Sequence, residues 1–177
     1  MVAARARTPK YKSQAVFWNT VTNVVVPKQS VEQYRKGNRL ELPRCIERFD
    51  SQHEFKVYLE LVRMYGAECI IKQYPLEIIA PGYCYPKGKL WKVDFAILQT
   101  PASYAPSLYV EAKGVFLPEF GHTLASFEQT DPETFYQLFV VFTDKLPIEN
   151  LVVKNLLKSP CKNQLMTLKQ LKDSIKL

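Results

Sequence analysis

The chain has few of the residues that build metal clusters or covalent cross-links. Its 177 residues include four cysteines and two histidines, and no two cysteines form a Cys-x-x-Cys pair. Structural zinc sites use closely spaced pairs of such ligands, so a zinc site is not expected. A disulfide framework is typical of small secreted domains and is not expected in a chain of this length. We expect reduced, partly buried thiols.

Long apolar runs are also missing. No stretch reaches the roughly 18 apolar residues that a membrane-spanning helix requires. Residues 1–12 are basic, but no apolar segment follows them, so we do not expect them to form a secretory signal. These absences argue against a membrane protein and predict a cytoplasmic protein, built as one domain with a short appendage.

Positive charge is absent from one segment and concentrated in others. Residues 114–144 contain five acids and no Lys or Arg, whereas 1–48 and 145–177 carry net charges of +7 and +5. The segment 49–113 is neutral, with seven basic and seven acidic residues. Basic ends around a neutral or acidic middle suit a protein that grips a polyanion and presents carboxylates at its centre. Solubility alone explains the same charge equally well.

Hydrophobic periodicity and turn residues predict the order of the elements. We expect a strand over 14–26, a short helix near 31–36, a helix over 50–66, strands over 68–80, 89–98 and 107–116, helices within 118–136, a strand over 138–143, and helical pieces beyond 147 that break at 159–160. This order predicts an α/β or α+β fold, with helices flanking a mixed central sheet of four or more strands.

Two of the predicted strands carry charged residues inside apolar runs. In WKVDFAI (91–97) the acid is Asp94, and in YVEAKG (109–114) the charged residues are Glu111 and Lys113. The period of two places Glu111 and Lys113 on one face of their strand, and Asp94 opposite Val93 and Phe95. If the two strands are neighbours, the two carboxylates meet with Lys113 beside them. Taken alone, a Glu-x-Lys pair can also be an exposed ion pair.

Two adjacent carboxylates repel each other unless a positive charge lies between them. Mg²⁺, held by Asp94, Glu111 and the carbonyl oxygen of Ala112, fits that need. Such a metal would polarise a phosphate and activate a water, while Lys113 would position that water and offset developing charge. Gly114 would let the substrate backbone come close.

These motifs, Val-Asp-Phe-Ala-Ile followed by Tyr-Val-Glu-Ala-Lys-Gly, resemble the PD-(D/E)XK nuclease superfamily. The chain has Val93 where the family name has proline. The resemblance covers about residues 49–143 and implies a restriction-endonuclease-like core. The tails lie outside it, and there the residue pattern itself predicts a flexible basic arm over 1–13 and, within a single domain over 14–177, a helical extension over 147–177. It also implies Mg²⁺-dependent hydrolysis of DNA, with Mn²⁺ as a substitute ion and no small-molecule cofactor.

Members of that superfamily carry an additional acid on an N-terminal helix, and by resemblance this acid is Glu54. Glu54 would then be a catalytic residue and a further metal ligand. Ser51 and Glu54 also have the spacing of a capping box, which explains the pair without any catalytic role. Glu60, two turns further along, is the fallback, although we expect it to face solvent.

Several residues outside the carboxylate motifs are candidates for DNA contact. These are Arg5, Arg7, Lys10 and Lys12 in the arm, and Lys87, Lys89 and Lys92 beside Tyr83 and Tyr85. An aromatic and basic loop could enter a groove or stack on an unpaired base, although packing explains the tyrosines equally well. Where relatives place a phosphate-binding side chain after the lysine, this chain offers Gln129, Gln137, His122 and Thr123.

The leading hypothesis is an endonuclease of a phage or mobile element, acting on duplex or branched DNA in the cytoplasm of a bacterium or a phage-infected host. A junction resolvase, a site-specific homing or restriction-like cutter and a nuclease subunit of a transposition machine remain open. Cutting both strands favours a homodimer. The alternative is a non-catalytic DNA-binding or transposition-assembly module with the nuclease fold. A glycosidase has no need for Lys113 beside the carboxylates.

Overall fold

The computed structural model describes residues 14–38, 43–158 and 164–174. The chain divides into two compact units, residues 1–55 and 56–177. The prediction of a single domain over 14–177 stays a prediction, and the predicted arm at 1–13 lies outside the described residues. Among the helices of the described segments, none is both long and apolar enough to cross a bilayer.

The first unit contains a small antiparallel sheet and one helix. Its elements are β1 (Val16–Asn19), β2 (Val24–Val26), α1 (Lys28–Asn38) and β3 (Ile46–Phe49), with the strand order β2-β1-β3. The single strand expected over 14–26 is wrong, because the chain turns after Asn19. The Asn19 carboxamide oxygen accepts hydrogen bonds from the backbone N–H groups of Val21 and Thr22, and Asn23 takes the left-handed conformation, with φ 56°. The short helix expected near 31–36 is longer in the structure and covers all of α1.

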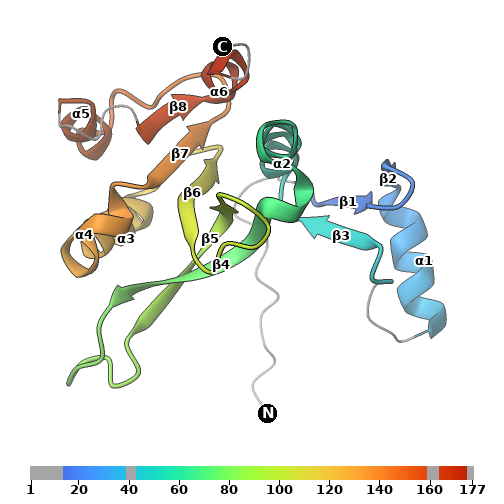
Figure 1. Ribbon diagram of the computed structural model, residues 1–177, viewed down its shortest axis with the longest axis horizontal. Helices are drawn as coiled ribbons and strands as arrows, with labels where there is room; N and C mark the ends of the chain where they lie inside the picture. The colour runs from blue at the N-terminus through green and yellow to red at the C-terminus, as the bar shows by residue number, and fades with distance from the viewer. Residues whose placement is uncertain (1–13, 39–42, 159–163, 175–177) are drawn as a thin grey trace. The chain divides into compact units, whose positions relative to one another are not determined.

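The second unit is a mixed α/β structure around a five-stranded sheet (Figure 1). Its elements are α2 (Gln52–Tyr65, which begins in the first unit), the 3₁₀ turn η1 (Ala67–Cys69), β4 (Ile70–Ile79), β5 (Lys89–Leu98), β6 (Pro106–Lys113), α3 (Pro118–Thr130), α4 (Pro132–Phe135), β7 (Leu138–Phe142), α5 (Leu151–Lys158), β8 (Leu165–Thr167) and α6 (Leu168–Ser174). The strand order is β4-β5-β6-β7-β8, with the first three strands antiparallel and the last two pairs parallel. The predicted mixed sheet with flanking helices is confirmed.

Local sequence signals explain where the helices after β6 begin. Pro118 and Pro132 occupy the first turns of α3 and α4, where a missing N–H costs nothing. The Asp131 carboxylate accepts the N–H of Thr134 at 3.0 Å and caps α4, which is one of the helices expected within 118–136. The edge strand β8 was not predicted, because three residues of LMT carry too little pattern to distinguish a strand from the helical run around them.

The two faces of the sheet are covered by different helices. On one face α3 supplies Phe120, Leu124 and Phe127 to the largest apolar cluster, which also includes Val140 and Phe142 of β7. On the other face the Tyr58 ring of α2 stacks on Phe95 of β5, with ring centroids 6.0 Å apart. The strand β7 has apolar residues on both faces, and four of its five residues are buried, as expected from its continuous apolar sequence.

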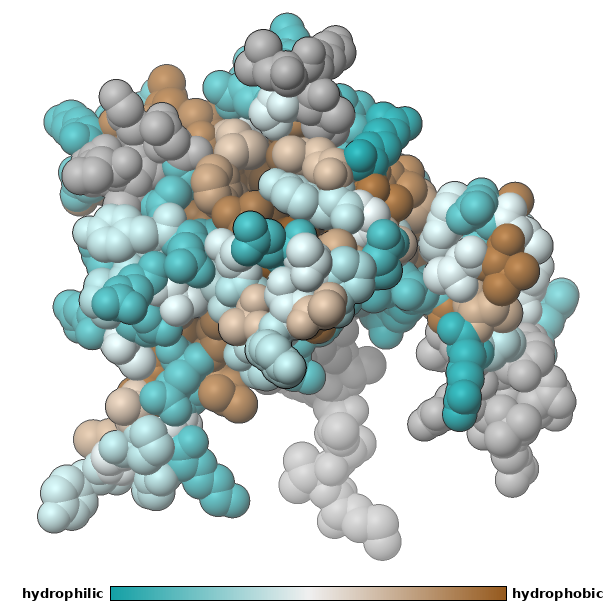
Figure 2. Space-filling view, viewed as in Figure 1, coloured by the Kyte–Doolittle hydropathy of each residue, from teal (hydrophilic) through white to brown (hydrophobic). Residues whose placement is uncertain are grey.

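Strands β4 and β5 continue as a two-stranded hairpin beyond the part of the sheet that β6 pairs. Strand β4 is paired with β5 as far as Ile79 and Lys89, whereas the described ladder between β5 and β6 runs from Leu98 back to Phe95. Figure 2 shows the end of this hairpin projecting from the second unit, with mostly hydrophilic residues on its surface. The sheet therefore opens at the residue just before Phe95, which is Asp94.

Candidate active site

The two predicted acids meet where strands β5 and β6 separate. The Asp94 N–H donates to Oε2 of Glu111 at 3.1 Å, and the Ala112 N–H donates to Oδ2 of Asp94 at 2.9 Å. Each carboxylate thus accepts a backbone hydrogen from the opposite strand, where a regular ladder would use a carbonyl oxygen. The two strands are neighbours in the sheet, and the structure therefore brings Asp94 and Glu111 together as expected.

Lys113 lies beside the same carboxylate pair. Its ammonium forms an ion pair with Oε1 of Glu111, and 27% of the Lys113 side chain is exposed against 3% of the Glu111 side chain. The Lys113 Nζ atom also lies 4.4 Å from the ring centroid of Phe120 on α3, a geometry in which a cation is attracted to an aromatic face. Glu111 and Lys113 therefore share one face of β6, as predicted, and Phe120 helps to orient the lysine.

The surroundings of Glu111 disfavour its charged form. Burial, followed by the neighbouring Asp94 carboxylate, raises the pKa of Glu111 from its ordinary 4.5 to about 8, although Lys113 acts in the opposite direction. A buried acid next to a second acid is stabilised by binding either a proton or a cation. This electrostatic imbalance is the main chemical property of the site.

Gln73 of β4 also contacts Asp94, and no sequence pattern predicted this contact. The Gln73 side-chain amide donates to Oδ1 of Asp94 at 3.3 Å. Its backbone has φ 53° in the middle of a strand, a conformation that costs a non-glycine residue roughly 1–2 kcal/mol. A strained residue that points an amide at a candidate metal ligand is a pattern typical of functional sites.

The side-chain alternation of β5 changes at the same point. Val93 belongs to the apolar cluster under α3, whereas Phe95, two residues further, packs against Tyr58 of α2. In a regular strand residues two apart share a face, so the expectation that Asp94 simply opposes Val93 and Phe95 is wrong. The irregular backbone at Gln73, which lies across from Asp94, accounts for the change. Asp94 is thereby turned into the gap between β5 and β6.

The residues of the site have the chemistry that a hard divalent cation requires. Asp94 and Glu111 offer four carboxylate oxygens, and each has a donor from the protein within reach. Carboxylate oxygens carry two lone pairs each, so these contacts leave acceptor capacity. Among the described residues, there is no group of three or more His, Cys, Asp or Glu side chains that could hold a metal ion. In the second unit a metal would therefore be held by two carboxylates, completed by the predicted Ala112 carbonyl and by water or phosphate.

Glu54 lies at the start of α2, in the first unit, and forms one half of the predicted capping box with Ser51, whereas its carboxylate reaches one residue further back, to Asp50. Its N–H donates to Oγ of Ser51 at 3.0 Å, and its Oε2 accepts the N–H of Asp50 at 2.7 Å. Its role as a metal ligand stays a prediction. Glu60, the fallback, is 5% exposed and pairs with Arg63 at 3.0 Å and Lys172 at 3.6 Å, so the expectation that it faces solvent is wrong.

Most of the remaining candidate residues lie on or after α3 and on the β4–β5 hairpin. Gln129, Gln137 and His122 are exposed on or after α3, and the Thr123 hydroxyl donates to the Glu119 carbonyl at 3.0 Å. The basic residues of the β4–β5 hairpin, Lys87, Lys89 and Lys92, are exposed. Four further predicted DNA contacts lie outside the described residues: Arg5, Arg7, Lys10 and Lys12.

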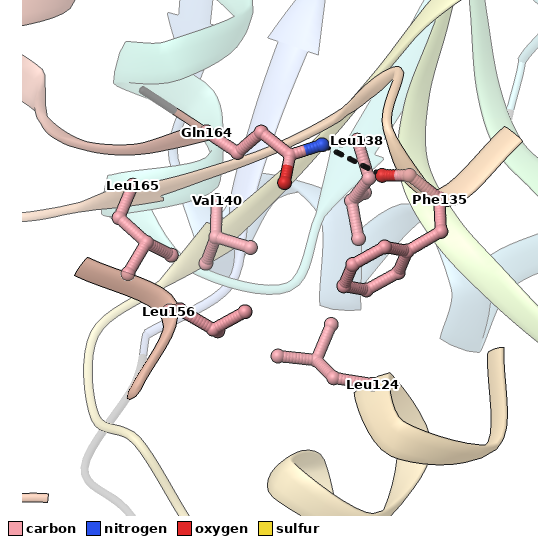
Figure 3. A pocket seen from close by; sticks show the side chains of 7 residues that line it. All are labelled: Leu124, Phe135, Leu138, Val140, Leu156, Gln164 and Leu165. Atoms are coloured by element: carbon pink, nitrogen blue, oxygen red, sulfur yellow. Dashed lines mark hydrogen bonds between the residues drawn. The ribbon is translucent and has the colours of Figure 1, made fainter. Parts of the chain in front are cut away.

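A small cavity under the sheet offers no alternative site. It measures about 10 Å³ and is lined mainly by apolar side chains (Figure 3), which is room for about one water molecule. Its polar lining residue, Gln164, donates through its amide to the Phe135 carbonyl at 2.7 Å. The cavity is a packing gap between α3, α5 and β7, too small for a substrate.

Comparisons with protein-family models, with curated proteins and with solved structures found no match for this chain. The chemistry of the site therefore has to be judged from its own geometry.

Proposed function

We propose that this protein is a metal-dependent DNA endonuclease with a restriction-endonuclease-like catalytic unit of the PD-(D/E)XK type. The observation that carries the proposal is the contact of Asp94 with Glu111, beside Lys113, at the point where β5 and β6 separate. The order of elements gives further support, because the acids follow α2 on the second and third strands of the sheet. This is the arrangement in that superfamily.

Asp94 and Glu111 would hold Mg²⁺, or Mn²⁺ in its place, together with the carbonyl oxygen of Ala112. When bound, the ion supplies a Lewis acid for the phosphate and lowers the pKa of a coordinated water. The protein's contribution is a preformed pair of acids whose orientation is fixed by backbone N–H groups. Their mutual repulsion favours cation binding, because the cation relieves it.

Lys113 would act on the reacting phosphate directly. Its ammonium is fixed between the Glu111 carboxylate and the face of Phe120, with about a quarter of its side chain open to solvent. From there it can donate to the attacking water or to a phosphoryl oxygen and offset the negative charge that develops there. If the ion pair between Lys113 and Glu111 served stability alone, a second acid beside it, Asp94, would not make it more stable.

DNA is the phosphodiester substrate that the superfamily resemblance implies, and the net charge of +7 suits a polyanion. Cleavage of both strands would be achieved most simply by a homodimer with one site per chain. Among the subclasses, a resolvase, a site-specific cutter and a transposition nuclease share this chemistry and differ in the DNA that they select.

The test is to incubate the purified protein with supercoiled plasmid and with a four-way junction, each with Mg²⁺ or with EDTA. We expect cleavage that depends on Mg²⁺ and is lost in Glu111→Gln and Lys113→Ala. The matched controls are Glu149→Gln and Lys154→Ala, which remove an exposed ion pair of the same unit whose atoms lie 3.9 Å apart. The controls should cleave like the unmodified protein.

Full activity in Lys113→Ala would contradict the mechanism. An absence of cleavage with every DNA, combined with retained DNA binding, would instead support the non-catalytic DNA-binding module. Cleavage of the junction without cleavage of linear duplex would select a resolvase, and a single discrete plasmid site would select a site-specific cutter.

A further inference from the structure

The β4–β5 hairpin ends in an ordered turn that presents an aromatic side chain to solvent. The Gly82 N–H donates to the Tyr85 carbonyl at 2.9 Å, and the Gly88 N–H donates to the same oxygen at 2.9 Å. Gly88 has φ +66°, and a Cβ there would lie 2.7 Å from the Ile79 carbonyl oxygen, so this turn requires glycine. The first of these bonds closes the turn with Tyr83 and Cys84 at its apex.

Tyr83 contributes no buried surface to the fold. Its relative exposure is 105%, and every residue from 80 to 87 is exposed. A tyrosine in a folded protein usually buries its ring or finds a partner for it. The ring belongs to the turn at the end of a two-stranded ribbon, and this end of the ribbon projects from the second unit (Figures 1 and 2). It is available for a partner that the chain itself does not supply.

The charge around this ring matches a nucleic acid. Between Ile78 and Val93 the chain carries three lysines and no acid, and all three, Lys87, Lys89 and Lys92, are exposed. From residue 80 to 92 it has no Arg, Asn, Gln, Ser, Thr, Asp or Glu. Apart from lysine, these are the side chains that read base edges in a DNA groove. The ribbon therefore has the means to bind phosphates and to stack on a base, but little means to read a base sequence.

The same ribbon leads directly to the carboxylate pair. At about 3.3 Å per residue, Lys89 lies roughly 16 Å along β5 from Asp94, the length of about five base pairs. One DNA molecule could therefore contact the hairpin and the carboxylate pair at the same time.

We propose that Tyr83 stacks on an unpaired base, so that the protein selects branched or gapped DNA over fully paired duplex. That the ligand is DNA rests on the proposed function, whereas the stacking contact rests on the exposed ring and the lysines of the hairpin. Aromatic stacking on an unpaired base tolerates any sequence, which fits a ribbon poor in base-reading side chains. Lys87 and Lys89 bind the adjacent phosphates.

The experiment measures binding in EDTA, so that cleavage plays no part. One DNA has a single unpaired 2-aminopurine at a gap, and a second DNA of equal length has the same base fully paired. Anisotropy gives the affinity, and 2-aminopurine fluorescence reports stacking. We expect Tyr83→Ala to weaken binding of the gapped DNA by about tenfold and to abolish the change in fluorescence, with duplex affinity unchanged. Tyr83→Trp should retain both signals.

The matched control is Tyr104→Ala. Tyr104 is as exposed as Tyr83, at 107%, but it lies beyond the opposite end of β5 and should have no effect. A double Lys87→Ala/Lys89→Ala variant should weaken binding of both DNAs and reduce the salt dependence of the affinity by about two ions.

Equal affinity of Tyr83→Ala and the unmodified protein for gapped DNA would overturn the inference. So would an equal loss for gapped and paired DNA, or an equal loss in Tyr104→Ala. Cleavage in Mg²⁺ is scored separately. Tyr83-dependent stacking without cleavage of any DNA would leave the inference standing and remove the proposed function, and cleavage without a Tyr83 effect would do the reverse.

Discussion

The backbone N–H of Asp94 donates a hydrogen bond to Oε2 of Glu111, with 3.1 Å between N and O. This bond from the main chain of one acid to the side chain of the other keeps the two residues close together. The reciprocal contact, from the Ala112 N–H to Asp94 at 2.9 Å, fixes the second acid in the same way. Neither contact removes the repulsion between the two carboxylates. The fold therefore preserves an unfavourable charge arrangement, which is expected where a ligand supplies the missing charge.

The first prediction concerns Glu111→Gln. The amide has the shape of the carboxylate but no charge, so we expect cleavage to fall by on the order of 10²-fold or more. In EDTA at pH 8 the variant should be at least as stable as the unmodified protein, because a buried charge next to Asp94 has been removed. Thermal unfolding monitors stability, with Glu149→Gln as the exposed control. Severe destabilisation of Glu111→Gln would show that the ion pair with Lys113 has a structural role.

The second prediction is the pH dependence of the metal-free protein. The pKa of Glu111 is raised in the folded state, from 4.5 to about 8, so between these values the folded chain binds more protons than the unfolded chain. Its contribution to the free energy of unfolding is therefore full below pH 4.5 and falls as the pH rises towards 8. Unfolding in EDTA from pH 5 to 8.5 should show this loss, and saturating Mg²⁺ at pH 8 should restore stability.

Other acids titrate over the same range, and Glu111→Gln separates them from Glu111. The difference in unfolding free energy between the two proteins should change in favour of the variant as the pH rises. A pH-independent difference would show that Glu111 is already ionised at pH 5, and the proposed imbalance of charge would then be wrong.

Much of the second unit could be predicted from its sequence, because its elements follow strong local patterns. Leu138–Phe142 is continuously apolar and forms a strand with both faces covered, and Asp131 before Pro132 begins a helix as expected. The meeting of Asp94 with Glu111 followed from two charged residues in neighbouring strands. The signals for this strand and this helix each lie within a few residues, which is the range over which sequence patterns are informative.

The local backbone irregularities could not be predicted. A glutamine gives no sign of a positive φ, since the conformation of Gln73 is imposed by the sheet around Asp94. The turn after Asn19 was missed because its polar residues lie inside a β-branched run. Glu60 was expected at the surface, but its pairing with Lys172 joins residues 112 positions apart, which a helical pattern cannot reveal.

The third prediction uses Gln73 to separate backbone strain from the amide contact. Gln73→Ala removes the hydrogen bond to Asp94 and keeps a side chain at φ 53°, whereas Gln73→Gly removes both. We expect both variants to need more Mg²⁺ for half-maximal cleavage, by about 10-fold, because Asp94 loses a group that orients it. Gln73→Gly should be more stable than Gln73→Ala by about 1 kcal/mol. Unchanged Mg²⁺ dependence in both variants would assign Gln73 a purely structural role.

The fourth prediction distinguishes the two roles of Glu54. Glutamine can serve in a capping box, so Glu54→Gln should retain the contacts with Ser51 and Asp50 while lacking the charge that a metal ligand needs. We expect Glu54→Gln to unfold like the unmodified protein and to lose cleavage. Ser51→Ala is the matched control: it removes the other half of the box, and should lose about 1 kcal/mol of stability but keep cleavage. If Glu54→Gln cleaves normally, the residue is a helix cap alone, and the site is confined to Asp94, Glu111 and Lys113.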